Sequence, residues 1–345
     1  MDPEGTTQTR PLVMADVAAR AGVSHQTVSR VLNDVPGVRP ATRLRVEQAI
    51  TQLRYSPSPA ARALVTRRTR MIGLIAPSSA DYGPSSIVLH FNEAARDARY
   101  GVVTVTMVDT SHDSVRTAVE SLLSQRVEAV VVVVADVEVI EGIRSLDVGV
   151  PVVAVTASQR PAHLTTSIDQ YRGARLAVRH LIDLGHRNIA HISGPASAPD
   201  SIERLRGWRD ELAAARLVAR EPGHGDWTAR SGAAFGEQLA QDRDTTAVFA
   251  SNDQMALGVM SALLAHGRGV PSQVSVVGFD DVPEAAYFSP ALTTVAQDFA
   301  ALGALTMQRV LIAVEDSDAP GESLPLPTRL IIRESTAPPG ASPTA

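Results

Sequence analysis

Hydrophobic positions near the start of the chain recur at helical spacing in three short stretches. Residues 16–21 place apolar side chains on one face, and Gly22 tolerates the left-handed backbone that ends a helix. Ser24 suits the N-cap of a second helix over about residues 25–32, and Pro40 suits the first turn of a third. The apolar positions expected to pack together are Val17, Ala18, Ala21, Val28, Val31, Leu32, Val46, Ile50 and Leu53. Three short helices with a sharp first turn predict a helix-turn-helix domain.

From Met71 onward, short apolar stretches alternate with amphipathic ones. The first series predicts strands at residues 71–76, 102–108, 130–134 and 152–155, and helices near 85–98, 113–124 and 137–145. The second predicts helices near residues 173–184, 202–215, 229–239 and 254–265, and strands at 189–193, 247–250 and 274–278. This alternation is typical of α/β proteins with parallel sheets. Two Rossmann-like halves joined through residues 166–169 would form a cleft at the carboxyl ends of the strands.

The composition excludes several kinds of chemistry. The 345 residues include no cysteine and no lysine, which excludes disulfides, zinc–thiolate sites, cysteine nucleophiles and lysine-dependent motifs. The sequence also lacks G-x-S-x-G, H-E-x-x-H and a metal-ligand cluster, so we expect no enzyme activity, cofactor or metal. The N-terminus does not have the pattern of a signal peptide, and no apolar run approaches the roughly 20 residues of a membrane helix. We therefore expect a cytoplasmic protein without a membrane partner.

Charge is spread unevenly along the chain. Residues 10–70 contain 11 arginines and three acidic residues, a net charge of +8, whereas the whole chain has a net charge of −5. A basic head on an acidic body suggests that only the head meets a polyanion. A solvated basic face without a partner would give the same pattern.

The second helix carries the residues expected to read DNA. In a helix-turn-helix domain this helix lies in the major groove. Gln26 suits adenine and Arg30 suits guanine, and each such pair discriminates by about 1–3 kcal/mol. A phosphate contact is the alternative for Arg30, and a phosphate contact or packing is the alternative for His25. The hydroxyls of Thr27 and Ser29 suit phosphates or capping.

The sequence DVAARAGVSHQTVSRVLN, followed by VEQAITQLRYSPSPAARAL, resembles the DNA-binding head of the LacI/GalR family of transcriptional regulators. The resemblance implies that residues 58–66 form a hinge helix that orders on DNA as a pair from two subunits. It also implies that Leu64 enters the minor groove at the operator centre, where wedging costs a few kcal/mol; the alternative is an ordinary linker leucine. The DNA contacts expected on this basis are Ser24, His25, Gln26, Thr27, Ser29, Arg30, Asn33, Tyr55, Arg62 and Leu64.

Polar residues follow several expected strands of the body. Asn252 and Asp280 each follow a strand, Arg204 is expected to open a helix, and Trp227 lies in the sequence HGDW. Carboxylate, amide and guanidinium groups bind adjacent hydroxyls, and an indole covers the apolar face of a pyranose ring. A single aspartate after a strand is more often a helix cap, but recurrence at one sheet edge favours a sugar-binding cleft.

The body is similar to the effector domain of the same family over almost its full length, most closely in GDWTARSG, SNDQMALGVMSAL, VSVVGFDD and LTTVAQDF. The resemblance implies a two-lobed, periplasmic-binding-protein-like fold and effector contacts at Ser78, Asp81, Ile87, Arg204, Trp227, Asn252, Asp280, Gln297 and Phe299. Core packing is the alternative for Trp227 and Phe299. Two positions depart from the family pattern. Asp81 stands where an apolar residue is expected, and Thr156 stands where the family usually places an aspartate.

We therefore expect an α/β protein with a helix-turn-helix head and a two-lobed body. The expected divisions are a disordered tail (1–10), the DNA-binding domain (11–57), a hinge helix and linker (58–69), the body (70–336) and a second tail (337–345). Lobe 1 is expected near residues 70–167 and 298–320, and lobe 2 near 168–297 and 321–336.

The predicted function is that of a repressor whose affinity for a palindromic double-stranded operator is controlled by a sugar or glycoside. The resemblance favours an inducer. The alternative is a sugar-binding protein of a transport system with the same two-lobed fold. Two subunits are expected to pack through their bodies. Because the final residues are Pro-rich and carry no heptads, we expect homodimers and no larger assembly.

Overall fold

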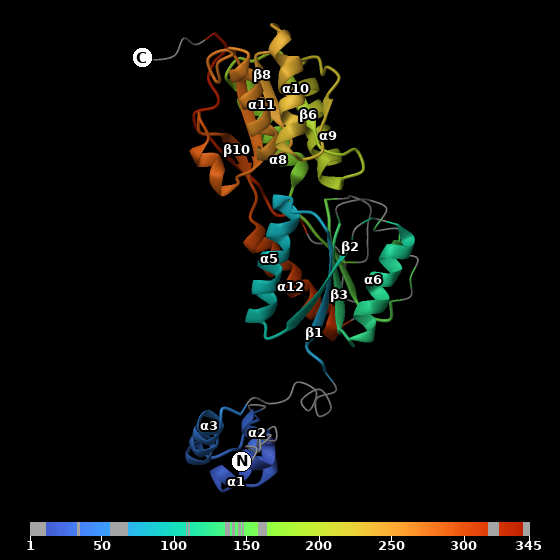
Figure 1. Ribbon diagram of the computed structural model, residues 1–345, viewed down its shortest axis with the longest axis vertical. Coiled ribbons are helices and arrows are strands. Elements are labelled where there is room, and N and C mark those ends of the chain that lie inside the picture. Colours follow the sequence, from blue (N-terminus) through green and yellow to red (C-terminus); the bar gives the residue numbers. More distant parts are fainter. Residues whose placement is uncertain are drawn as a thin grey trace, which may run out of the picture. The chain divides into compact units, whose positions relative to one another are not determined.

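The computed structural model describes residues 12–32, 35–55, 68–107, 109, 111–134, 139, 142–143, 146, 148–157, 164–316 and 324–340. The chain divides into two compact units, Met1–Thr69 and Arg70–Ala345. Figure 1 shows a small all-helical unit and a larger unit that contains two sheets. No helix among the described residues is long and apolar enough to cross a membrane.

The small unit is a three-helix head. Its helices are α1 (Met14–Ala21), α2 (His25–Leu32) and α3 (Pro40–Leu53). Gly22 ends α1 with φ = 63°, and the hydroxyl of Ser24 accepts the N–H of Thr27 at 3.2 Å, as the sequence predicts. Val17, Val28 and Val46 are fully buried at the centre of the head. Ala49 is buried as well, whereas Leu32, Ile50 and Leu53 pack at the edge of the core and are only partly buried.

The first sheet of the body has the strand order β2-β1-β3-β4-β5, and all neighbouring strands are parallel. Its strands are β1 (Met71–Pro77), β2 (Gly101–Met107), β3 (Ala129–Val133), β4 (Val152–Val155) and β5 (Thr165–Thr166). Helices α5 (Tyr82–Asp97) and α12 (Phe299–Glu315) cover one face, and α6 (His112–Ser124) covers the other (Figure 1). The central strand β3 has the sequence AVVVV and is buried on both faces, as expected for a covered parallel sheet. We call this sheet with its three helices the first lobe.

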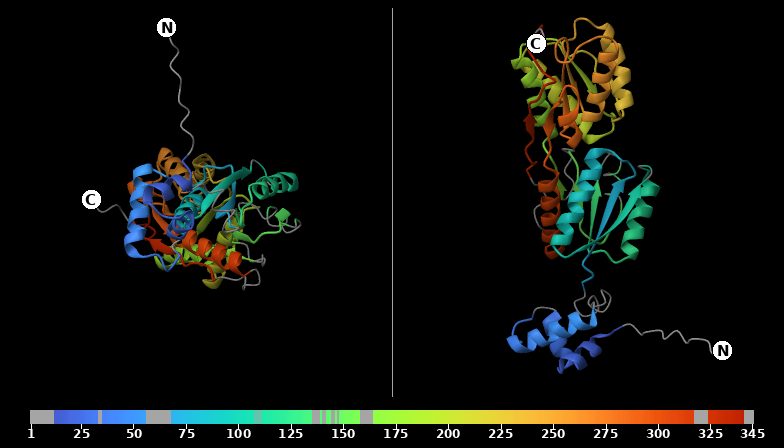
Figure 2. Two further views of the ribbon diagram at one scale, coloured as in Figure 1. Left: turned by 90° about the horizontal axis from the view of Figure 1, so that it is seen from below. Right: turned by 60° about the vertical axis from the view of Figure 1, so that its left-hand side comes forward.

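The second sheet has the order β11-β10-β9-β8-β6-β7 and is parallel except for the β10–β11 pair. Its strands are β6 (Ile189–Ser193), β7 (Gly223–His224), β8 (Ala247–Ala250), β9 (Ser275–Asp280), β10 (Thr293–Ala296) and β11 (Arg329–Ile331). One face is covered by α8 (Gln170–Asp183) and α9 (Pro199–Ala214), and the other by α10 (Ala229–Gln241) and α11 (Asp253–Ala265) (Figure 2). A 3-10 helix, Pro283–Tyr287, follows β9. We call this sheet with its helices the second lobe.

Close packing of α10 on α11 depends on glycine. A Cβ atom on Gly258 would lie 1.9 Å from the carbonyl oxygen of Ala229, and one on Gly232 would lie 2.1 Å from that of Met255. Both distances are far below van der Waals contact. The two glycines therefore let the helix backbones meet behind the sheet.

The α/β, parallel-sheet prediction is confirmed, with several differences in detail. Helices α5, α8 and α9 each begin three residues before the expected position, so Arg204 lies inside α9 and does not open it. The hydrophobic pattern predicts no helix at α12, but the resemblance to the family places residues 298–320 in the first lobe, where α12 packs. The described residues exclude most of the helix expected near 137–145, the 1–10 tail, most of the 337–345 tail, the hinge over 58–66, and Asn33, Arg62 and Leu64.

Candidate binding cavity and nucleic-acid interface

A cavity of about 800 Å³, including its opening to solvent, lies where the two lobes meet. Eight of the nine predicted effector contacts line it: Asp81, Ile87, Arg204, Trp227, Asn252, Asp280, Gln297 and Phe299. Ser78 does not line it and is exposed just beyond β1, so the effector contact expected of Ser78 has no support from this geometry.

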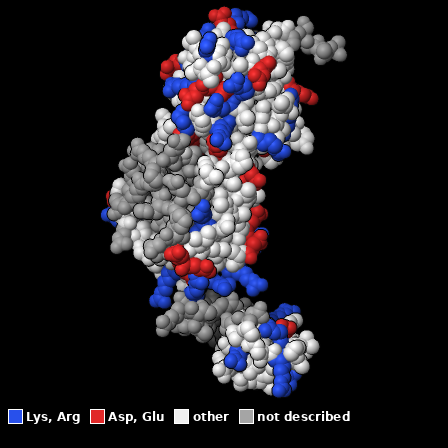
Figure 3. Space-filling view, turned by 180° about the vertical axis from the view of Figure 1, so that it is seen from behind, with Lys and Arg blue, Asp and Glu red and all other residues white. Residues whose placement is uncertain are grey.

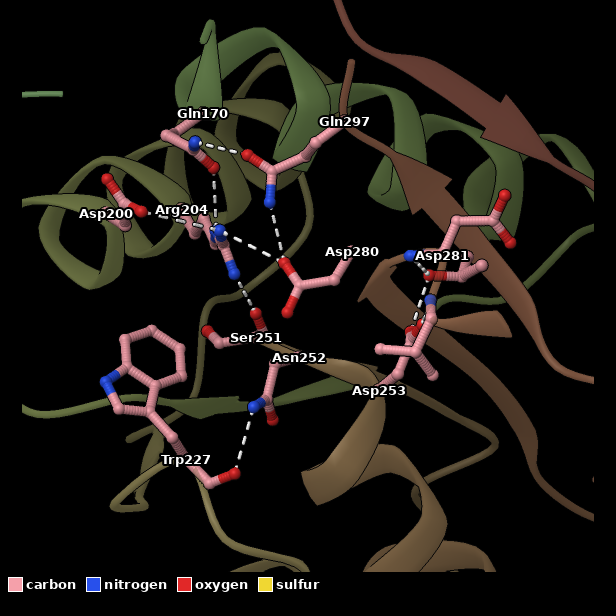
Figure 4. A network of polar contacts seen from close by, with 12 residues as sticks. Gln170, Asp200, Arg204, Trp227, Ser251, Asn252, Asp253, Asp280, Asp281 and Gln297 are labelled. Carbon is pink, nitrogen blue, oxygen red and sulfur yellow. Dashed lines mark hydrogen bonds and ion pairs between the residues drawn. The ribbon is translucent and has the colours of Figure 1, made fainter. Parts of the chain in front are cut away.

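Arg204 is the centre of a buried polar network on the second-lobe side of the cavity (Figure 4). Its side chain is 4 % exposed. The guanidinium donates to Gln170 Oε1 at 2.9 Å and to the carbonyl oxygen of Ser251. It also lies 3.5 Å from a carboxylate oxygen of Asp280 and 3.7 Å from one of Asp200. Because helix α9 and the buried partners hold it, this guanidinium has a fixed direction.

The Arg204 guanidinium also has aromatic neighbours. It lies 3.8 Å from the centre of the Phe279 ring and 5.6 Å from that of Trp227. A cation over an aromatic face is stabilised by the ring's quadrupole. These contacts place a charged group against apolar surface, a combination that suits a ligand with both hydroxyls and an apolar face.

Asp280, at the end of β9, is the carboxylate that faces Arg204. It has φ = 113°, a backbone conformation rarely adopted by residues other than glycine. It accepts a hydrogen bond from Gln297 Nε2 at 2.7 Å, and Gln297 Oε1 in turn accepts one from Gln170 Nε2 at 2.7 Å. Burial raises the pKa of Asp280 to about 7, although Arg204 acts in the opposite direction. The strained backbone and shifted pKa are typical of a functional position.

A second buried carboxylate supports the loop after β9. Asp253 begins α11, is fully buried, and accepts hydrogen bonds from Thr294 Oγ1 at 2.5 Å and the N–H of Val282 at 2.9 Å. Burial raises the pKa of Asp253 well above its usual value. Beside it, Asp281 pairs with Arg333 at 2.7 Å. These contacts hold the loop after β9 in place, and neither Asp253 nor Asp281 lines the cavity.

Asn252 and Trp227 form the next part of the wall. Asn252 caps α11 by accepting the N–H of Met255 at 2.9 Å, and its Nδ2 donates to the carbonyl oxygen of Trp227 at 2.9 Å. Trp227 is partly buried, with φ = 71°. A Cβ atom on Gly194 would lie 2.4 Å from the indole, so only glycine leaves room for the ring there.

The first-lobe side of the cavity is mainly apolar. Phe299 is 6 % exposed and meets Tyr82 edge to face, with ring centres 5.8 Å apart. Ile87 packs against the same core cluster. Thr156 also lines the cavity and is 5 % exposed. Asp81 lies at the N-terminus of α5, and its side chain does not cap that helix.

The exposed face of α2 in the head is polar. His25, Gln26 and Arg30 are exposed, and the side chain of none of the three forms a hydrogen bond or ion pair with a described residue. Thr27 is partly buried, with its hydroxyl 2.9 Å from that of Ser24, and it therefore belongs to the cap of α2. Ser29 is also partly buried. On the face of the head in Figure 3, basic side chains outnumber acidic ones.

Tyr55 is placed differently from the expectation of a DNA contact. Its side chain is 9 % exposed and packs in the hydrophobic core of the head, following the C-terminal end of α3. The structure therefore gives Tyr55 a packing role, because an aromatic ring this deeply buried presents little surface to a nucleic acid.

Comparisons with known proteins agree with this arrangement. Residues 13–58 match the family model "Bacterial regulatory proteins, lacI family", and residues 178–336 match "Periplasmic binding protein-like domain". The chain is 35 % identical to the lactose operon repressor of Escherichia coli K12 over 97 % of this chain and 94 % of that protein. The chain belongs to the lacI family.

Solved structures of lacI-family proteins extend the agreement to three dimensions. A lac repressor dimer bound to operator and the anti-inducer ONPF matches 95 % of this chain and all of that chain, with a TM-score of 0.84 and 34 % identity. The regulator CelR of Thermobifida fusca is 35 % identical over 92 % of this chain and 96 % of that protein. As a lacI-family protein, this chain is a DNA-binding transcriptional repressor controlled by a small molecule, and it is not an enzyme.

Sequence reasoning missed two residues of the buried Arg204 network. Gln170 is the first residue of α8 and connects Arg204 to Gln297, and Asp200 lies one turn before Arg204 on α9. Neither follows a strand, so the strand-end pattern gave no signal for them. In the sequence, only the spacing of Asp200 and Arg204, four residues apart on one helix, indicates that their side chains are neighbours.

Proposed function

We propose that this repressor binds a palindromic operator as a homodimer and that a sugar or glycoside in the cavity controls its affinity for the operator. The observation that supports this proposal best is the buried Arg204 network lining a cavity between two lobes. Fixed guanidinium, carboxylate and amide groups bind adjacent hydroxyls in pairs, while Trp227 and Phe299 offer apolar faces.

Two structures of relatives support a sugar-like ligand. CelR has been solved as a complex with cellobiose, and it matches 94 % of this chain at 32 % identity and a TM-score of 0.71. The lac repressor has been solved with ONPG in the repressed state, at 34 % identity and a TM-score of 0.83. The transport-protein alternative shares the two-lobed fold but does not account for the lacI-family head at residues 13–58.

Control requires that the ligand bind two conformations of the body unequally. The cavity has this capacity because its walls belong to both lobes, so a ligand that touches both favours one relative arrangement. We propose that this change reaches DNA through the hinge at residues 58–66, with Leu64 entering the minor groove and Arg62 near a phosphate. The residues proposed to read bases are Gln26 and Arg30, on the exposed face of α2.

Induction is the proposed direction, in which the sugar prefers the state that does not bind DNA. The proposed assembly is a dimer, in keeping with the lac repressor dimer on operator, and the proposed place of action is the cytoplasm. Sedimentation velocity on the purified chain is expected to show dimers. A stable tetramer would contradict this assembly.

The function is tested by fluorescence anisotropy on duplexes from the DNA upstream of the gene. The protein is expected to prefer an inverted repeat over scrambled DNA of the same length, and its affinity should fall steeply with salt. Adding mono- and disaccharides one at a time is expected to identify at least one that weakens operator binding by about fivefold or more. Absence of any preferred duplex, or of any sugar effect, would contradict the proposal.

A further inference from the structure

The two walls of the cavity differ in how their polar groups are satisfied. On the second-lobe wall, Gln170, Arg204, Asp280 and Gln297 bond to one another. Most of the first-lobe wall is apolar. Among its described lining residues, Asp81 is the only carboxylate.

Asp81 occupies a helix-capping position without acting as a cap. It precedes the first residue of α5, with φ = −59° and ψ = 140°, but its carboxylate accepts no N–H from the first turn. Elsewhere in this chain, Asp169 and Asp298 do cap helices, accepting the N–H of the residue three positions later at 2.9 and 2.8 Å. The Asp81 carboxylate forms no hydrogen bond or ion pair with any described residue.

Asp81 is close enough to the opposite wall to interact with it electrically. Burial is the main reason for the raised pKa of Asp280, and the negative charge of Asp81 adds to that increase. The two carboxylates therefore belong to one cavity, one on each lobe. The carboxylate of Asp280 has partners, whereas that of Asp81 has none among the described residues.

A ligand that fills the cavity must replace the water around Asp81. If the part of the ligand beside Asp81 is an alkyl group, the carboxylate is left desolvated without a hydrogen-bond donor, which is costly. If that part carries hydroxyls, they donate to the carboxylate, and bonds to an ionised acceptor are strong.

We propose that Asp81 is a specificity-determining residue that selects effectors with a hydroxyl-bearing second unit, such as a disaccharide, over glycosides with an alkyl aglycone. This inference rests on the proposed sugar-controlled function and adds the class of sugar to it. In this arrangement the second-lobe network binds the first sugar ring, and Asp81 contacts the group attached to that ring.

The test measures affinities of the full-length protein for matched sugar pairs by isothermal titration calorimetry. The pairs are cellobiose with isopropyl β-D-glucoside, lactose with isopropyl β-D-galactoside, and maltose with isopropyl α-D-glucoside. For the pair whose first ring is recognised, the wild type is expected to prefer the disaccharide by about tenfold or more. Asp81→Leu is expected to reduce this preference by about tenfold or more, by weakening disaccharide binding and strengthening alkyl glycoside binding.

Two further variants separate specificity from folding. Asp81→Asn keeps an acceptor oxygen and is expected to retain most of the preference. Asp97→Leu makes the same change at an exposed residue of the same helix and is expected to leave the preference unchanged. Because Asp81 does not cap α5, Asp81→Leu is also expected to keep its melting temperature and its operator affinity without sugar.

The possible failures are distinguishable. If the wild type binds sugars and Asp81→Leu leaves the preference within about twofold, Asp81 does not select the second unit, and the sugar-controlled function stands. A wild-type preference for the alkyl glycoside would also overturn the inference alone. If the wild type binds no sugar of either kind, the proposed function fails, and the inference fails with it.

Discussion

The head and the cavity place their functional polar residues in opposite environments. Gln26 and Arg30 are exposed on α2, and their side chains have no partner among the described residues. Arg204 and Asp280 are 3 % and 6 % exposed and belong to one hydrogen-bonded network. A side chain proposed to read DNA stays free to bind its partner, and the hydrophobic core of the head holds its helix in place. A cavity residue is already fixed by other polar groups, so it contributes to folding as well as to binding.

The largest expected effect follows from removing the centre of the cavity network. Arg204→Ala leaves Asp280 buried without its cation and Gln170 without a donor, and is expected to lower the free energy of unfolding by about 3 kcal/mol. Sugar binding is expected to weaken by about 100-fold or more, while the preference for operator DNA remains. Urea denaturation, calorimetry and anisotropy measure the three quantities.

The matched control for that variant is Arg220→Ala, which removes a half-exposed arginine paired with Asp242. It is expected to change the stability by no more than about 1 kcal/mol and to leave sugar binding intact. Equal losses in the two variants would mean that the buried network has no special role.

A second prediction concerns pH and Asp280. Its pKa is about 7 in the folded protein, above the usual 3.8, so the folded state holds a proton that the unfolded chain has released. The associated stabilisation is complete below about pH 4 and is lost as the pH rises through 7. Asp280→Asn cannot ionise, and is therefore expected to gain about 2 kcal/mol of stability relative to the wild type between pH 5 and pH 7.

Denaturation curves of both proteins across this range provide the measurement. Comparing the two proteins at each pH cancels the pH dependence of stability that comes from other groups. His191 is one such group, because burial lowers its pKa to about 3. A constant difference between the curves would show that Asp280 does not titrate in this range.

The smallest expected effect on folding lies in the head. Arg30→Ala removes an exposed side chain and is expected to change the stability of the head by less than about 0.5 kcal/mol. Operator affinity is expected to fall by about 10- to 100-fold, because a base contact is lost. Arg20→Ala, at an exposed position on α1, removes the same charge and serves as the control.

The two arginine variants distinguish a base contact from a phosphate contact. Both are expected to weaken binding to scrambled DNA by similar, small factors, and only Arg30→Ala should weaken operator binding further. If Arg30→Ala lowers the affinity for operator and scrambled DNA equally, Arg30 contacts phosphate and does not read a base.

The sequence predicts some parts of the molecule better than others for physical reasons. The head is recognisable because its elements depend on local signals, such as Gly22 with positive φ and the Ser24 cap. Strands such as β3 are recognisable because burial on both faces demands a continuous apolar run. Helix α12 packs in a lobe whose other helices come much earlier in the chain. The local pattern predicts no helix there, and only the resemblance to the family places residues 298–320 in that lobe.

The cavity shows the same limit. Asn252 lies just after β8 and Asp280 ends β9, so their meeting at one sheet edge is predictable from topology. Gln170 and Asp200 reach the cavity from helices, and only the three-dimensional arrangement reveals their role. Ser78 also follows a strand, but it is exposed and does not line the cavity. A position at the end of a strand therefore predicts which edge of the sheet a residue occupies, but it does not predict where its side chain points.

The central claim is that operator binding by the head and sugar binding in the cavity are thermodynamically coupled. Measuring the sugar affinity with and without operator tests this claim most directly. A sugar that weakens operator binding is titrated by calorimetry into the protein alone and into the protein saturated with operator. The account predicts that operator weakens sugar binding by the same factor as sugar weakens operator binding, about fivefold or more. Equal sugar affinities in the two titrations would contradict it.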